Sequence, residues 1–250
     1  MKITHIISGL DRGGAENVLF RLIGAQPNPS MHSVISLTDE GIFGERLRAL
    51  GVEVHCLGLR RGGPTSPLVI FSLSLKLRQK RPDAVQTWMY HADLLGGIAA
   101  RLAGIPVCWG IHHSNLSPEH NKRTTLLVAK ACSWLSLIIP SKIISCSHRS
   151  VDVHLGLGYA DKFQVIPNGL NISDYKPLTP DLRNNIRKSL NISFDCKIIG
   201  HIGRAEPLKD HSTLFATFAK IAEICPEAVL LLAGSGLHAG DEYYENIISV

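Results

Sequence analysis

Two cations in one short loop are the residues with the clearest chemical meaning in this sequence. Arg204 and Lys209 lie between Gly203, which ends an apolar run, and a segment of helical period that begins at His211. Asp210 is placed to cap that helix. A guanidinium and an ammonium beside a helix N-terminus form a site for a diphosphate, because both charges and the free N–H groups attract its oxygens. The alternative is that both cations are solvated surface charges.

A diphosphate site of this kind can also assist a reaction. Negative charge grows on a phosphate as its bond to a sugar breaks, and fixed positive groups stabilise that charge in the transition state. The loop therefore predicts either binding of a diphosphate or its departure as a leaving group.

A glycine-containing turn near the start of the chain is a second candidate. The segment from Gly9 to Gly14 follows an apolar run, and Gly13 and Gly14 open a segment of helical period. Glycines at such a turn let a phosphate approach the backbone closely. The spacing is neither Gly-x-Gly-x-x-Gly nor a P-loop, so dinucleotide binding is not indicated. A purely structural turn between strand and helix is the alternative.

Three histidines follow predicted strands. His112 and His113 come directly after an apolar run that ends at Ile111, and His91 follows a run that ends near Trp88. The carboxyl ends of parallel strands meet at one edge of a sheet, where open α/β folds bind ligands. No Asp or Cys joins these histidines at ligand spacing, so we predict no metal. Packing or surface histidines are the alternative.

Short apolar runs alternate with longer segments of helical period along most of the chain, which is typical of βαβ units and a parallel sheet. The predicted strands of the first part are residues 3–7, 34–37, 52–57, 84–88, 106–111, 142–146 and 162–166. The predicted helices include residues 15–25, 43–50 and 92–103 and a helix that starts near Leu68. A single open sheet accounts for everything up to about residue 168.

The pattern changes after this sheet. Asn168 and Gly169 belong to a turn signal, and a polar stretch with two prolines follows at residues 171–180. The pattern then restarts, with strands predicted at residues 198–203 and 228–233 and a helix at residues 211–224. We therefore predict two α/β domains, residues 1–172 and 173–250. The second has 78 residues against a usual ~100–150, so we expect it to be incomplete.

Charge and composition narrow the classes of partner. Residues 1–172 carry 18 Lys and Arg against 11 Asp and Glu, whereas residues 173–250 carry 8 against 10. Arg60, Arg61 and the cluster from Lys76 to Arg81 supply much of the excess, and that cluster follows an apolar run from Leu68. This arrangement could rest on an anionic membrane surface, or it could be a helix with a cationic last turn. No nucleic-acid motif is present, so we predict no nucleic-acid partner.

The short apolar start is not a signal peptide, and six scattered cysteines are typical of a reduced cytosolic protein. We therefore expect a cytoplasmic protein, peripheral on the inner face of the cell membrane.

The order of several motifs resembles glycosyltransferase family 4, the large "group 1" family of retaining enzymes with the GT-B fold. The motifs that carry the resemblance span residues 13–16, 86–93, 109–112, 166–169 and 200–204, together with Lys209-Asp210. The resemblance implies two Rossmann-like domains with parallel sheets, the first on the acceptor side and the second for the donor. It also implies an enzyme that moves a sugar from a nucleotide-sugar to a lipid- or polysaccharide-linked acceptor. UDP is the expected nucleotide, because it is the commonest in the family.

The resemblance also implies roles for single residues. Arg204 and Lys209 would hold the donor diphosphate, with Gly13 and Gly14 near it. His112 would contact the sugar that is transferred. The resemblance further places His91, His113, Asn168 and Gly169 at the acceptor side or near the hinge. The basic pair would replace a metal, so no cofactor is expected.

Two other functions stay open at this point. The family's later Glu-x₇-Glu motif is not found before Val250, so the chain could be a truncated, non-catalytic remnant or binding module. A sugar-nucleotide epimerase of the same fold is a weaker alternative.

Overall fold

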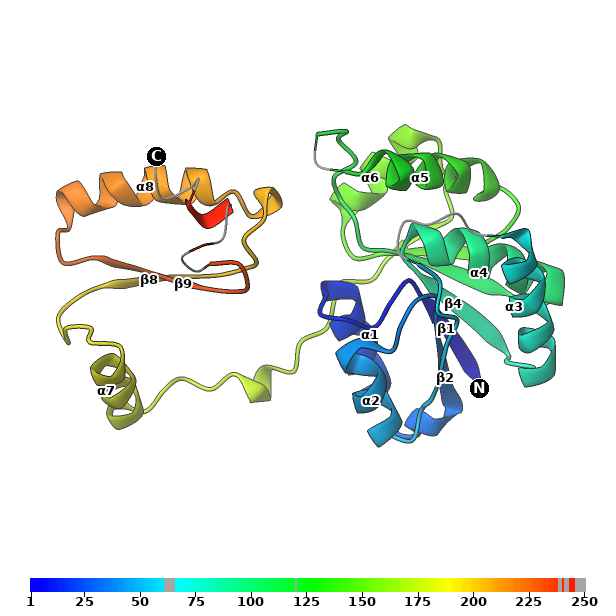
Figure 1. Ribbon diagram of the computed structural model, residues 1–250, viewed down its shortest axis with the longest axis horizontal. Coiled ribbons are helices and arrows are strands. Elements are labelled where there is room, and N and C mark those ends of the chain that lie inside the picture. The colour runs from blue at the N-terminus through cyan, green and yellow to red at the C-terminus, as the bar shows by residue number, and fades with distance from the viewer. Residues whose placement is uncertain (61–65, 120, 238–239, 241–242, 246–250) are drawn as a thin grey trace. The chain divides into compact units, whose positions relative to one another are not determined.

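The computed structural model describes residues 1–60, 66–119, 121–237, 240 and 243–245. Arg61, one of the basic residues of the first part, lies outside the described residues. The chain divides into two compact units, residues 1–170 and 171–250 (Figure 1). The division falls two residues before the boundary at which the sequence analysis separates the domains. Each unit is described by itself below.

The first unit is built on a seven-stranded sheet in which every neighbouring pair is parallel. Its strands are β1 (Ile3–Ile7), β2 (His32–Ser36), β3 (Glu53–Cys56), β4 (Ala84–Trp88), β5 (Val107–Ile111), β6 (Lys142–Ser145) and β7 (Phe163–Val165). They lie in the order β3-β2-β1-β4-β5-β6-β7. The strand order changes direction between β1 and β4, and this switch point is where such sheets bind ligands.

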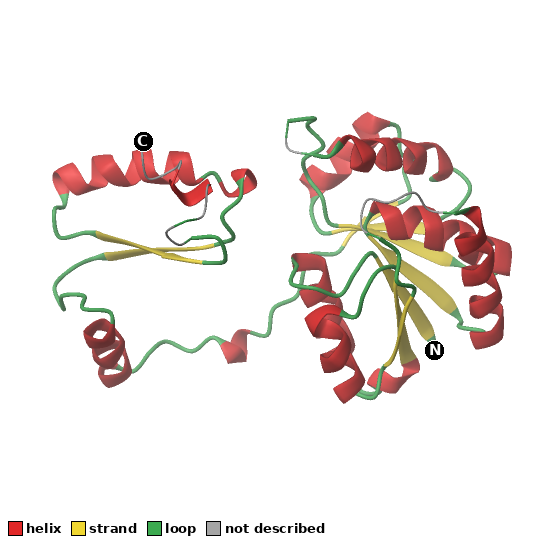
Figure 2. Cartoon of the chain, in the orientation of Figure 1, coloured by secondary structure: helices red, strands yellow, loops and turns green. Residues whose placement is uncertain are grey.

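Helices cover both faces of this sheet, as Figures 1 and 2 show. The helices α1 (Gly14–Gly24) and α2 (Gly41–Ala49) pack on one face around Leu19 and Phe43. The helices α3 (Pro67–Lys80), α4 (Tyr90–Ala103) and α5 (Arg123–Leu135) pack on the other face. β1 has the sequence Ile3-Thr4-His5-Ile6-Ile7, and the apolar residues at both ends of this largely buried strand make it recognisable from sequence.

The helices α6 (His148–Leu157) and α7 (Pro180–Ser189) were not predicted from the sequence. Helix α6 follows β6, starts at the cap residue Ser147 and ends at Gly158 in the left-handed region. Helix α7 starts at Thr179, whose side chain accepts from the Leu182 N–H. Both helices carry many polar residues, so their apolar stripes are too narrow to stand out in the sequence.

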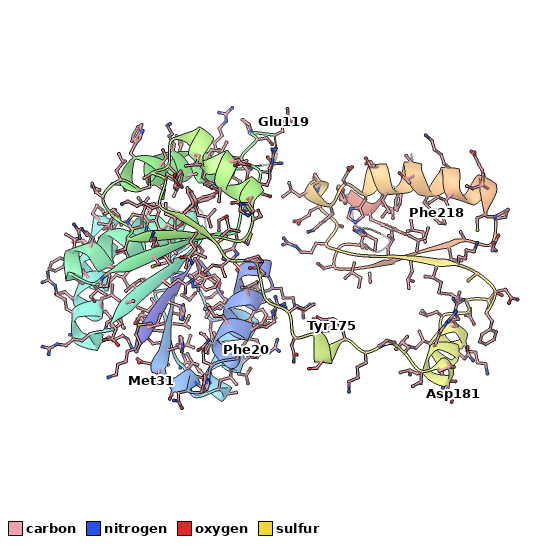
Figure 3. The ribbon with its side chains drawn as sticks, turned by 180° about the vertical axis from the view of Figure 1, so that it is seen from behind. Phe20, Met31, Glu119, Tyr175, Asp181 and Phe218 are labelled. Atoms are coloured by element: carbon pink, nitrogen blue, oxygen red, sulfur yellow. The ribbon has the colours of Figure 1, made fainter. Side chains whose placement is uncertain are left out.

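The second unit contains a two-stranded parallel sheet of β8 (Ile198–Ile202) and β9 (Val229–Ala233). The helix α8 (His211–Ile224) connects them after a short 3₁₀ turn, η3 (Pro207–Lys209). Another such turn, η2 (Ile172–Asp174), lies near the start of this unit, and η1 (Pro29–Met31) precedes β2 in the first. Figure 3 shows the side chains and labels Phe218 on α8 and Asp181 in the first turn of α7.

No helix in the described part of the chain is long and apolar enough to cross a membrane.

Gly97 and Gly156 are a matched pair for a test of this packing. Both lie inside helices, but a Cβ at Gly97 would sit 2.5 Å from Trp109 Nε1, whereas a Cβ at Gly156 would have no described atom within 4 Å. We expect Gly97→Ala to lower the free energy of unfolding by about 1–3 kcal/mol through overpacking. Gly156→Ala should raise it by up to about 1 kcal/mol, because alanine favours helix. Urea unfolding measures both, and equal effects would contradict the packing of α4 on β5.

Candidate functional site

The loop that follows β1 is held in place by α2 and the loop before it. The Phe43 N–H donates to the Leu10 carbonyl at 2.9 Å, and the Thr38 hydroxyl donates to the Ser8 carbonyl at 3.0 Å. Gly41 has φ 49°, and a Cβ there would lie 2.3 Å from the Leu10 carbonyl carbon. Only glycine allows this close approach, so α2 fixes the course of the β1 loop at the switch point.

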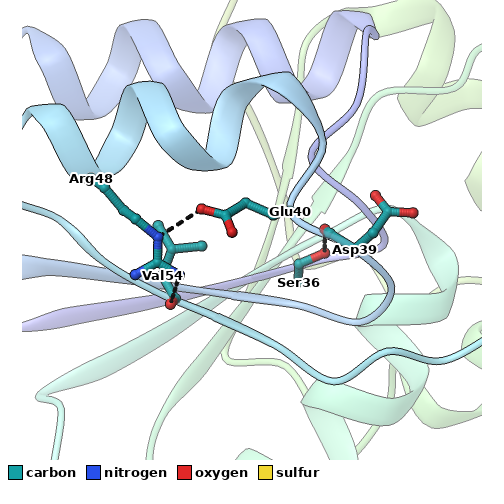
Figure 4. Close-up of polar contacts among 5 residues, drawn as sticks. All are labelled: Ser36, Asp39, Glu40, Arg48 and Val54. Atoms are coloured by element: carbon teal, nitrogen blue, oxygen red, sulfur yellow. Dashed lines mark hydrogen bonds and ion pairs between the residues drawn. The ribbon is translucent and has the colours of Figure 1, made fainter.

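The start of α2 is itself anchored, as Figure 4 shows. Arg48 Nε donates to Glu40 Oε1 at 2.6 Å, and its Nη2 donates to the Val54 carbonyl at 2.8 Å. The Ser36 hydroxyl donates to the Asp39 carbonyl at 2.6 Å. These contacts join α2 to the carboxyl end of β2 and to β3.

Gly13 and Gly14, both predicted near a donor, have different surroundings. Gly13 caps α1, and a Cβ on it would lie 2.1 Å from Glu16 Oε2. Glu16 is the third helical residue, from which a carboxylate reaches back over the helix start. Gly14 has no described atom within 4 Å of an added Cβ. Of the two glycines, Gly14 is therefore the one with free space beside its Cα, which a ligand could approach.

The turn from β4 into α4 is strained. Met89 has φ 73° and ψ 155°, a conformation that costs a non-glycine residue free energy. Its N–H donates to the Gly110 carbonyl at 3.0 Å, which holds the turn against β5. This turn lets the chain leave the sheet at Trp88 and start α4 at Tyr90, so the side chain of His91 is exposed at the sheet edge.

His112 lies flat on a buried indole. Its imidazole stacks on the Trp88 ring with centroids 5.1 Å apart and planes 8° apart. Burial, and next the nearby His113, lower the pKa of His112 below its ordinary value. A neutral imidazole has one donor and one acceptor, so His112 can hydrogen-bond a hydroxyl group at neutral pH.

His113 is tied to α6. The Ser150 hydroxyl donates to the His113 carbonyl at 2.6 Å, and the Tyr90 ring meets the His113 ring edge-on at 5.9 Å. His154 Nδ1 lies 2.6 Å from the Ser150 carbonyl and must donate to it, because a carbonyl only accepts. Its Nε2 therefore accepts from the Tyr90 hydroxyl at 2.7 Å. No role is predicted from the sequence for Tyr90 or His154, although Tyr90 lies within the motif at residues 86–93.

A buried carboxyl group, that of Asp93 in the first turn of α4, contacts β4 near the carboxyl edge of the sheet. The Thr87 hydroxyl lies 2.5 Å from Asp93 Oδ1, and both residues are fully buried. Burial raises the pKa of Asp93 well above its ordinary value, which favours a neutral carboxyl group. Asp93 therefore joins the start of α4 to β4 through Thr87, and it is not open to solvent.

The second unit holds its candidate loop by backbone contacts. The Gly203 N–H donates to the Ala233 carbonyl, and the Ala205 N–H donates to the Ser235 carbonyl, each at 2.9 Å. Gly234 lies so close that a Cβ on it would be 1.7 Å from the Gly203 carbonyl oxygen. The loops after β8 and β9 are therefore joined by backbone contacts into one surface, which needs glycine at position 234.

Arg204 and Lys209 are both exposed on that surface. The Arg204 side chain is 61% exposed, and its Nη2 lies 3.1 Å from the Glu206 carboxylate. An exposed pair of this kind contributes little free energy, so a diphosphate can compete for the guanidinium. The Lys209 stem lies beside Gly203, with its Cγ and Cδ 3.5 Å from the place of an added Cβ. Asp210 caps α8 as predicted, since it accepts from the Thr213 N–H.

Asn168 and Gly169 are exposed and lie at the end of the first unit, directly before Leu170. Their predicted place near a hinge stays a prediction. Among the described residues no group of three or more His, Cys, Asp or Glu side chains could hold a metal ion.

Comparison with known proteins shows the family and the fold class of the chain. The family model of Glycosyltransferase Family 4 matches residues 12–174, which is more than half of the chain. The chain belongs to glycosyltransferase family 4. Its fold is the mixed α/β architecture of the GT-B glycosyltransferases, as the resemblance in the sequence predicts.

Three similar proteins cover nearly the whole chain. The putative glycosyltransferase EpsF of Bacillus subtilis is 25% identical over 96% of this chain and 63% of its own length. The UDP-Gal:alpha-D-GlcNAc-diphosphoundecaprenol alpha-1,3-galactosyltransferase of Escherichia coli is 26% identical over 98% of this chain and 64% of its own. The structure of Anabaena HepE in complex with UDP is 26% identical with a TM-score of 0.80, and covers 100% of this chain and 65% of that one. The chain thus spans slightly less than two thirds of these relatives.

The buried histidine His5 predicts a pH-dependent stability. Burial, and next the neighbouring His32, lower the pKa of His5 from 6.5 to about 3. Between these values the unfolded chain binds a proton that the folded chain excludes, so stability falls as pH falls below about 6.5. The expected slope is up to about 1.4 kcal/mol per pH unit for this group.

Urea unfolding at several pH values between 7 and 4 measures the slope. His5→Asn removes the titrating group and should reduce this slope by up to about 1.4 kcal/mol per pH unit, the contribution of one proton. Equal slopes for the variant and the wild-type protein would contradict a neutral, buried His5.

Proposed function

We propose that the protein carrying this sequence transfers a sugar from a UDP-sugar to a lipid-linked acceptor. The observation that carries the proposal is the surface formed by the joined loops after β8 and β9, on which Arg204 and Lys209 are exposed. Two cations beside the N-terminus of a helix, at the carboxyl edge of a parallel sheet, suit a nucleoside diphosphate.

The relatives support the nucleotide and the acceptor class. The E. coli relative is named for a UDP-galactose donor and a diphosphoundecaprenol-linked acceptor. HepE has been crystallised with UDP, with UDP-glucose, and with UDP and glucose. We therefore propose UDP as the nucleotide of the donor. We propose a sugar linked to a polyprenyl diphosphate, and not a free sugar, as the acceptor.

The proposed reaction retains the configuration of the transferred carbon. The acceptor hydroxyl attacks the same face from which the diphosphate departs, and an oxygen of that diphosphate accepts the hydroxyl proton. Arg204 and Lys209 stabilise the charge that grows on the leaving group. His112, neutral and fixed on Trp88, hydrogen-bonds a hydroxyl of the transferring sugar.

A transfer assay tests the proposal directly. Radiolabelled UDP- and GDP-sugars are incubated with polyprenyl-diphosphate-linked sugars and with the protein that carries this sequence. Transfer from a UDP-sugar to the lipid fraction is expected, and NMR of the product gives the configuration at the new bond. No transfer from any donor, together with tight UDP binding, would instead favour a binding protein of the same fold.

Lys209 allows a charge-matched test of the diphosphate site. Lys209→Met should weaken UDP binding by about tenfold or more, because a hydrogen bond to a charged group contributes about 1.5–3 kcal/mol. Lys220→Met is the control, since Lys220 is exposed on α8 of the same unit. Calorimetry with UDP measures both, and equal losses for the two variants would reject Lys209 as a ligand.

We also propose that the reaction needs no divalent cation, because the basic pair neutralises the diphosphate. Transfer in excess EDTA should proceed at the rate found with added Mg²⁺. A loss of transfer in EDTA that Mg²⁺ restores would contradict this part of the proposal.

The acceptor class requires contact with a membrane, and α5 offers a suitable surface. We define the α5 patch as the exposed apolar side chains of Leu127 and Trp134 on α5 and of Leu137 and Ile138, which directly follow this helix; all four are 65–70% exposed. Lys130 lies over the Trp134 ring at 5.9 Å. The sequence has no Asp or Glu between Glu119 and Asp152 but several Lys and Arg. Exposed apolar side chains in a segment that carries Lys and Arg but no Asp or Glu suit an anionic lipid surface.

The basic cluster on α3, which the sequence analysis considered for this contact, is partly used inside the unit. Lys80 pairs with Glu53, and Arg78 donates to the Leu102 carbonyl at 2.6 Å. Its apolar residues Leu68 and Phe71 are nevertheless exposed. Because two cations of α3 are used inside the unit, we choose the α5 patch for the contact, with the protein peripheral on the cytoplasmic face of the membrane.

Vesicle flotation compares the two helices. Trp134→Ser/Leu137→Ser should lower binding to phosphatidylglycerol-containing vesicles by more than about tenfold, since burying one large apolar side chain contributes about 1.5–3 kcal/mol. Leu68→Ser/Phe71→Ser is the matched control on α3 and should bind as the wild type does. The opposite result would move the contact to α3.

A further inference from the structure

Three buried side chains form a row beneath His112 on one face of the first sheet. His32 lies at the start of β2, His5 in the middle of β1 and Trp88 at the end of β4, and all three are at most 9% exposed. Trp88 Nε1 lies 3.2 Å from His5 Nδ1, and His5 Nε2 lies 2.9 Å from His32 Nδ1. The row therefore connects the core of the sheet to its carboxyl edge.

The donors in this row point one way. An indole N–H can only donate, so His5 Nδ1 must accept from Trp88. The proton of neutral His5 is then on Nε2, from which it donates to His32 Nδ1. A second proton on either imidazole would set two donors against each other. Both rings are thus held neutral in a single tautomer.

The bond to His5 restricts the indole on which His112 lies. Without an acceptor at His5, nothing polar among the described residues would hold the Trp88 N–H inside the core, and an unpaired buried donor costs about 1–3 kcal/mol. The indole would then turn or shift to find another partner. Because His112 stacks on this ring with planes only 8° apart, its imidazole would follow.

We propose that His5 is a positioning residue for His112. It acts through the Trp88 hydrogen bond, which fixes the plane of the indole and so the orientation of the imidazole at the sheet edge. The inference rests on the proposed function for its effect on transfer, in which His112 contacts the sugar. The coupling between His5 and His112 itself is independent of that function.

Two variants of His5 separate the hydrogen bond from the packing. His5→Phe keeps a flat ring but has no acceptor. His5→Asn loses the ring but keeps an acceptor, Oδ1, on the atom that carries Nδ1 in histidine. A structural role would make both variants defective, whereas a positioning role predicts that Asn restores what Phe removes.

NMR tests the coupling without any assay of activity. The indole N–H signal of Trp88, assigned with Trp88→Phe, should move upfield in His5→Phe and remain near the wild-type position in His5→Asn. The Cε1–H signal of His112, assigned with His112→Ala, should lose part of the ring-current shift from Trp88 in His5→Phe only. Unchanged His112 signals in a folded His5→Phe protein would overturn the inference.

Kinetics tests the consequence for transfer. His5→Phe should lower kcat about tenfold, while the KM for the UDP-sugar stays near the wild-type value and His5→Asn recovers most of the rate. In a His112→Ala background His5→Phe should cause no further loss, because the two residues act through one contact. An unchanged kcat in His5→Phe, or full additivity with His112→Ala, would overturn the inference while the proposed function stands. If the wild-type protein transferred no sugar, the proposed function would fail and the NMR result would decide the coupling.

Discussion

The parallel direction of all strands is the constraint on which the rest of each unit depends. In the first unit it brings the carboxyl ends of β1, β4 and β5 to one edge, with the switch point between β1 and β4. The candidate residues Gly14, His91 and His112 follow these three strands and therefore lie at this edge of the first sheet. The second unit repeats the arrangement, since β8 and β9 are parallel and their following loops form one surface.

Much of this arrangement follows from the sequence. Strands buried on both faces are rich in apolar and β-branched residues, so β1 and β4 are predicted at the residues where they occur. The helix α8 is also predicted with its observed bounds, because its apolar period and the cap Asp210 agree. The positions of His112 and Arg204 at sheet edges then follow from chain order alone.

The interactions that orient these residues do not follow from the sequence. Residues far apart in the chain make them, as when Trp88 binds His5, or Gly234 meets the backbone of Gly203. The strained turn at Met89 contains no glycine from which it could be predicted. The pairing of Arg204 with Glu206 depends on side-chain rotamers. Sequence patterns give periodicity along one segment, whereas these contacts depend on the register between segments.

The central claim is that the loops after β8 and β9 bind the diphosphate of a nucleotide. The most direct measurement is the change in backbone amide NMR signals of the isotope-labelled protein as UDP is added. The account predicts that the amides of Gly203, Arg204 and Ser235 shift with saturation, and that uridine, which lacks the diphosphate, shifts them far less. Shifts confined to the outer face of α8, or equal shifts with uridine, would contradict it.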